Sequence, residues 1–81
     1  MSNLELERRV KPMIWDDQDG GSYSWPLGLH YYTEECDEDE WYVSCMVGND
    51  DIWQGDNCLT REAAKAQAQY DYARRVLEAA T

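Results

Sequence analysis

The sequence holds few residues that could perform acid–base or nucleophilic chemistry. His30 is the only histidine, and no serine or cysteine nucleophile pattern surrounds it. Nucleophilic catalysis needs a nucleophile, a base and a group that orients the base. Gly20-Gly21 lacks the Lys-Ser/Thr that follows in a phosphate-binding loop. We therefore predict no catalytic or cofactor-binding residue and a protein that is not an enzyme; His30 acting as a base for Cys36 or Cys45 is the alternative.

The sequence contains no complete metal-binding motif. The run Asp17-Gln18-Asp19-Gly20 has the start of a calcium loop, but the twelfth position is Gly28 and not the glutamate such a loop requires. An odd number of cysteines in a chain without an export signal indicates free thiols. We predict no metal site. The alternative is a zinc ion held by four ligands, His30, Cys36, Cys45 and Cys58. Their spacing lacks the close Cys-x2-Cys pair that is typical of zinc sites.

Acidic side chains are the dominant chemical feature. The 81 residues include 17 Asp and Glu against 7 Lys and Arg, which gives a formal net charge of −10 at pH 7. Residues 12–60 contain no Lys or Arg, so the middle of the chain is strongly acidic while its two ends are nearly balanced. The twelve acids of this segment are Asp16, Asp17, Asp19, Glu34, Glu35, Asp37, Glu38, Asp39, Glu40, Asp50, Asp51 and Asp56.

This charge distribution excludes nucleic-acid binding through phosphate contacts, which needs clustered Lys and Arg, and disfavours an anionic membrane surface. A purely solubilising surface normally mixes both signs, so we expect a basic protein partner, with mere solubility as the alternative. Tryptophans beside the acids are typical of interface anchors. The predicted partner-binding residues are Glu34, Glu35, Asp37, Glu38, Asp39, Glu40, Trp41, Asp50, Asp51 and Trp53.

The chain length allows one domain, residues 1–81, with a thin core. Residues 11–58 contain short runs of strand-forming residues between Asp- and Gly-rich turns, and residues 16–21 read as a loop. Pro26 makes its segment an edge strand or a loop. We predict an α+β fold, in which a three- to four-stranded antiparallel sheet (11–58) is packed by one C-terminal helix (60–80) and preceded by an N-terminal arm (1–10).

The helix has a clear start and an apolar stripe. The hydroxyl of Thr60 can accept a hydrogen bond from a free backbone N–H of the first turn, so Thr60 is the predicted N-cap. The stripe recurs at spacings of three and four residues, which predicts that it faces the sheet. Its members are Ala63, Ala66, Tyr70, Ala73, Leu77 and Ala80.

The cellular compartment is predicted from the absence of two sequence signals, a membrane-spanning segment and a secretory signal. No stretch approaches the ~18 apolar residues needed to span a bilayer. The N-terminus lacks a basic region followed by an apolar run, as a secretory signal requires. We therefore expect a cytoplasmic protein.

The C-terminal half resembles small proteins encoded by bacteriophages and prophages. The resemblance rests on the run from Leu59 to Tyr72 (Leu-Thr-Arg-Glu-Ala-Ala-Lys-Ala-Gln-Ala-Gln-Tyr-Asp-Tyr), with Ile14-Trp15 and Gly21-Ser22-Tyr23 upstream. Small acidic phage proteins of this build are also similar to anti-CRISPR proteins, which bind their targets stoichiometrically. The resemblance implies an inhibitor of a bacterial nucleic-acid-handling defence complex, acting in the host cytoplasm on a basic nucleic-acid-binding protein or complex. The alternative is a phage accessory or structural protein that homodimerises through its aromatic face, its acidity serving solubility.

Overall fold

The computed structural model describes residues 10–80, so the predicted N-terminal arm lies almost wholly outside the described residues. Five strands follow one another as β1 (Asp16–Gln18), β2 (Gly21–Ser24), β3 (His30–Asp37), β4 (Glu40–Val47) and β5 (Asp50–Gln54). A short 3-10 turn, η1 (Pro26–Gly28), joins β2 to β3, and the helix α2 (Arg61–Ala80) ends the chain. All pairings are antiparallel and the order is β1-β2-β3-β4-β5. The predicted α+β class, with an antiparallel sheet and one C-terminal helix, is confirmed.

The predicted number of three to four strands is wrong, because residues 16–21 form a hairpin where a loop was expected. β1 pairs with β2, with Asp16 opposite Tyr23. Its acidic residues are stabilised by distant partners: Asp17 accepts a 2.7 Å hydrogen bond from Ser22 Oγ and lies 2.7 Å from Lys65 Nζ. These bonds hold the pKa of the Asp17 carboxyl below its usual value. Local sequence pattern carries no sign of these helix-to-strand contacts.

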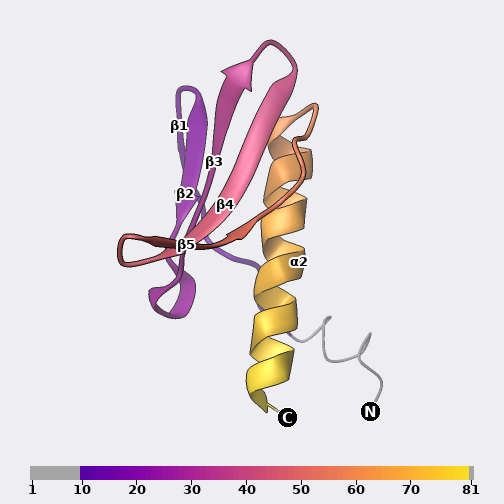
Figure 1. The fold of residues 1–81 in the computed structure, drawn as a ribbon. Helices are drawn as coiled ribbons and strands as arrows, with labels where there is room; N and C mark the ends of the chain where they lie inside the picture. The colour runs from indigo at the N-terminus through magenta and orange to yellow at the C-terminus, as the bar shows by residue number, and fades with distance from the viewer. Residues whose placement is uncertain (1–9, 81) are drawn as a thin grey trace.

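The helix covers one face of the sheet and leaves the other open (Figure 1). Side chains alternate between the two faces along each strand. Tyr31, Val43 and Cys45 point toward α2 and are fully buried, where they pack with Ala64 and Ala68 of the helix. Alanines at the contact let the helix lie close to the sheet, which suits a core of this size.

Thr60 is confirmed as the N-cap, since its Oγ1 accepts a 3.1 Å hydrogen bond from the backbone N–H of Ala63. The predicted core-facing stripe is wrong over the first half of the helix. Ala63 and Ala66 are exposed and Tyr70 is 65% exposed, whereas Ala64 and Ala68 face the sheet. The helix is therefore rotated relative to its apolar periodicity.

A buried carboxylate accounts for this rotation. Asp71 is 2% exposed and accepts a 2.6 Å hydrogen bond from Tyr31 Oη on β3. Arg74 and Arg75 donate to its two oxygens at 2.7 and 2.8 Å. Burial raises the pKa of Asp71, but the three hydrogen bonds outweigh burial and hold it below the ordinary 3.8. Only one rotation of the helix brings Asp71 to Tyr31.

We expect Asp71→Asn to lower the free energy of unfolding at pH 7 by about 2 kcal/mol, because it weakens a buried, charge-assisted network. A carboxyl whose pKa is lowered by folding stabilises above its unfolded value and loses that contribution as the pH falls. The difference between wild type and variant should therefore shrink below about pH 3.8. Urea titrations over a pH series measure it.

The matched control is Glu62→Gln, which removes the same charge from an exposed position on the same helix. Its effect on stability should stay within about 0.5 kcal/mol. Equal effects of the two variants, or an Asp71 effect that persists unchanged at low pH, would contradict the assigned role of Asp71.

Candidate functional site

The predicted acidic residues lie at two opposite ends of the sheet, except for Glu34 and Glu35, which lie within β3. Asp37 and Glu40 close the β3–β4 hairpin, with Glu38 and Asp39 at its turn. Asp50 and Asp51 begin β5, beyond the turn at the other end of β4. The eight residues of β4 separate the two groups by roughly 25 Å. The structure therefore does not bring all predicted acids into one cluster.

The two predicted aromatic anchors belong to the helix-covered side. Trp41 is 8% exposed and lies beneath the guanidinium of Arg61, 4.9 Å from the ring centroid. Trp53 is half-buried, packs edge-on against Tyr31 and lines a groove of about 450 Å³ with Ala63, Ala66 and Tyr70. Trp41 is thus a core residue and is removed from the candidate interface, because its ring is covered by α2.

Most of the acids have no basic partner. Among residues 10–80, salt bridges join Lys65 to Asp17 and Glu62, Arg74 to Asp71 and Glu78, and Arg75 to Asp71. Of the twelve acids in the acidic segment, Asp17 alone has such a contact within the described part of the chain. The Lys and Arg side chains of α2 make their contacts on the helix side, so within residues 10–80 they do not neutralise the acids on the open side of the sheet.

The open side carries a second feature, which we call the aromatic face: Tyr23, Trp25, His30, Tyr32 and Tyr42. The Trp25 indole stacks on the imidazole of His30 at 4.8 Å and 11°. Tyr32 contacts His30 at 5.4 Å and Tyr42 at 6.1 Å, while Tyr23 lies 6.4 Å from Trp25. The uncovered face of an antiparallel sheet is usually polar, so a continuous set of rings there marks a candidate interface.

Glu34 is hydrogen-bonded to two tyrosines of the aromatic face. Its carboxylate accepts hydrogen bonds from Tyr42 Oη at 2.6 Å and Tyr23 Oη at 3.1 Å. Gly21, paired with Glu34, permits this arrangement, because a Cβ there would lie 2.7 Å from Tyr23 Oη. The hydrogen bond to Glu34, with burial second, raises the pKa of Tyr42, and burial followed by the same carboxylate raises that of Tyr23. The rings are therefore held in a defined arrangement.

A strained turn precedes the aromatic face on β3. Leu27 adopts φ 51°, ψ 36°, a left-handed conformation that costs a bulky residue roughly 1–2 kcal/mol, and its side chain is 81% exposed. The turn is closed by the backbone bond from Leu29 N–H to Pro26 O at 2.9 Å. It connects Trp25 to His30, so that the two rings can stack. Such outliers tend to occur at functional sites.

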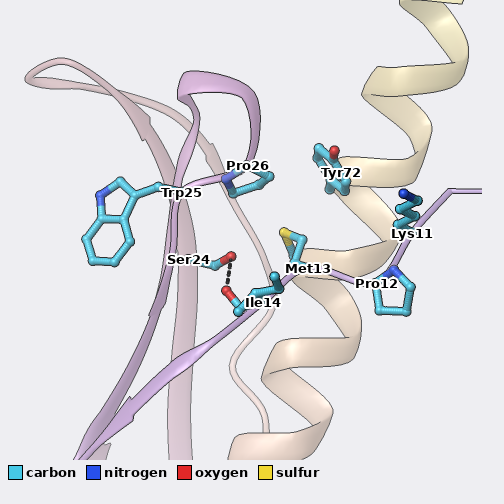
Figure 2. A pocket seen from close by; sticks show the side chains of 8 residues that line it. All are labelled: Lys11, Pro12, Met13, Ile14, Ser24, Trp25, Pro26 and Tyr72. Atoms are coloured by element: carbon cyan, nitrogen blue, oxygen red, sulfur yellow. Dashed lines mark hydrogen bonds between the residues drawn. The ribbon is translucent and has the colours of Figure 1, made fainter.

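A groove of about 340 Å³ lies on the other side of β2 (Figure 2). Its lining includes Met13, Ser24, Trp25 and Tyr72, and Ser24 Oγ donates a 2.7 Å hydrogen bond to Ile14 O. Figure 2 shows Trp25 projecting away from α2, whereas Tyr72 comes from the helix itself. The only charged side chain among the groove's lining residues is Lys11, so this groove is not part of the acidic surface.

The described residues do not assemble the zinc alternative. Cys36, Cys45 and Cys58 are free thiols; Cys45 is buried toward α2, while His30 lies on the opposite face. Within residues 10–80, no three His, Cys, Asp or Glu side chains are grouped so as to hold a metal ion. In the same range, no helix has the length and apolar character needed to cross a membrane.

From the sequence, an aromatic face is expected only in the homodimer alternative, and the residues that form it are not identified. Period-two spacing could have indicated these residues: Tyr23 on β2 and Trp25, just after the end of β2, are two residues apart, as are His30, Tyr32 and Glu34 on β3. The strain at Leu27 and the resulting Trp25–His30 stack have no sequence signal.

Comparison with known proteins yields no relative: no protein-family model matches the chain, and neither a curated protein nor a solved structure is detectably similar to it. Function is therefore inferred from the surface itself.

We expect Glu34→Gln to lower the pKa values of Tyr42 and Tyr23 toward the ordinary 10.0, because the nearby negative charge is removed. A spectrophotometric tyrosinate titration should show two of the six tyrosines ionising earlier. Glu35→Gln removes the same charge from the next, exposed residue and should leave the titration unchanged. Superimposable curves for Glu34→Gln and wild type would rule out the bridging carboxylate.

Proposed function

We propose that this protein is a non-enzymatic, stoichiometric inhibitor of the anti-CRISPR type. It binds a basic nucleic-acid-binding protein or complex of a bacterial host through its acidic sheet. The observation that carries the proposal is the separation of charge: the helix side uses its cations internally, and eleven of the twelve acids in the middle segment have no basic partner among residues 10–80.

The arrangement of the acids suits a surface that normally holds nucleic acid. Carboxylates at the β3–β4 hairpin and at the start of β5 lie at opposite ends of the eight-residue strand β4, roughly 25 Å apart. A negative surface of this kind is complementary in charge to a basic groove that normally holds nucleic acid. Self-repulsion among them destabilises the free protein and is relieved when a basic partner binds.

The second candidate is a phage accessory or structural protein that homodimerises through the aromatic face. The uncovered rings favour it, above all Trp25, which is 60% exposed. The charge opposes it, because each copy carries a formal −10 and both copies would bring Asp16, Glu34 and Asp51 to the same contact. Sedimentation at low and high salt distinguishes the two, since screening strengthens such a dimer and weakens an electrostatic complex.

Reversing the hairpin acids Asp37, Glu38, Asp39 and Glu40 to Lys should weaken binding to the host target by about 100-fold or more, since each exposed charge contributes a fraction of a kcal/mol to about 1 kcal/mol. The measurement is a pull-down from host lysate at low and high salt, followed by binding titrations with the purified target. Single-stranded oligonucleotide should compete with the protein.

Glu38→Lys and the control Glu62→Lys form a matched pair, because both glutamates are exposed and undergo the same charge change. Only the hairpin variant should weaken binding, by a few-fold. Full inhibition by the fourfold variant would exclude the hairpin as the binding site. Target capture that is insensitive to salt would exclude the electrostatic mechanism.

A further inference from the structure

Two tryptophans on the helix side each have a cation of α2 over the ring. The guanidinium of Arg61 lies 4.9 Å from the centroid of Trp41, and Lys65 Nζ lies 5.7 Å from that of Trp15. A cation over an indole face is attracted by the electrons of the ring, and indole is the best acceptor among side chains. The protein therefore uses this contact twice to pack its helix.

Trp25 differs from these two residues in its surroundings. His30 stacks against its indole, and no Lys or Arg of residues 10–80 lies over the ring. The side chain remains 60% exposed and projects from β2 away from α2 (Figure 2). The indole is thus fixed in place by a neighbouring ring and accessible to a cation from outside.

Carboxylates surround the aromatic face on three strands. Asp16 on β1 is paired with Tyr23, Glu34 on β3 accepts from Tyr23 and Tyr42, and Asp51 on β5 accepts a 3.4 Å hydrogen bond from Tyr32. Among the described residues, the Lys and Arg side chains belong to α2 or, for Lys11, to the groove that Trp25 and Tyr72 also line. Figure 2 shows the Lys11 side chain beside α2 and the Trp25 indole pointing away from it. The charge of this face is therefore complementary to a cation and not to a phosphate or a second copy.

Building on the acidic binding surface proposed above, we propose that the aromatic face anchors an arginine side chain of the basic partner. Its guanidinium stacks on Trp25 while carboxylates of the same face accept its N–H groups. Arginine fits better than lysine because the guanidinium is planar, stacks on aromatic rings and presents a fork of donors to carboxylates. The hairpin acids then supply long-range attraction, and Trp25 supplies the specific contact.

The test uses the full chain with two fluorescently labelled probes of equal length and charge, an oligo-arginine and an oligo-lysine peptide, whose Kd values are measured by anisotropy. The wild-type protein should bind oligo-arginine about fivefold more tightly than oligo-lysine, the size expected for a partly exposed cation–ring contact. Trp25→Leu should abolish the preference and leave oligo-lysine binding within about twofold. Tyr70→Leu is the matched control, because Tyr70 is an aromatic residue of similar exposure on the outer side of α2, and it should leave both affinities unchanged.

The outcomes separate this inference from the proposed function. If the fourfold hairpin reversal weakens both peptides but Trp25→Leu keeps the arginine preference, the acidic surface stands and the arginine anchor is refuted. If neither peptide binds the wild-type protein, both proposals fail. Sedimentation completes the test: a wild-type dimer that Trp25→Leu dissociates would mean that a second copy, and not arginine, occupies the aromatic face.

Discussion

The hydrogen bond between Asp71 and Tyr31 determines how the two layers of this protein meet. A buried carboxylate must be fully bonded, and Asp71 obtains its partners from Tyr31 on β3 and from Arg74 and Arg75 one turn further along α2. This requirement fixes the rotation of the helix and places Ala64 and Ala68 on the sheet. It also engages both arginines on the helix side, so that within residues 10–80 neither arginine is available to the opposite face.

The sequence predicts those elements whose structure depends on neighbouring residues. It does not predict the features that depend on contacts between residues far apart in the chain. The N-cap at Thr60, the strands β3 to β5 and the C-terminal helix follow from side-chain preferences within a few residues. The strand β1 could not be predicted, because Asp17 is stabilised by Lys65 from the other end of the chain. The rotation of α2 could not be predicted either, because apolar periodicity contains no information about a buried Asp71. The position of Trp41 beside acids predicts an exposed anchor, but its ring is buried and lies under Arg61.

Segregation of charge and of aromatic rings makes the two faces of the sheet chemically different. On the covered face, Trp41 and Trp15 are in contact with cations of the same chain. On the open face, the rings are supported by one another and by Glu34, and the carboxylates there lack basic partners among residues 10–80. A partner that supplies positive charge would repeat on the open face the contact that the protein already makes internally. The charge of the open face is the observation that supports the proposed basic partner.

The strand order has a consequence for how the molecule is made. Each strand pairs with its neighbour in the chain, so the sheet can assemble one hairpin at a time, whereas the bond between Tyr31 and Asp71 joins residues 40 positions apart and must wait for the C-terminus. During synthesis both faces and both edges of the nascent sheet are consequently open to self-association. The edge strands β1 and β5 begin with Asp16-Asp17 and Asp50-Asp51, and paired charges of this kind discourage strand addition by another molecule. The acidity therefore protects the chain from aggregation before it folds, in addition to any role in recognition afterwards.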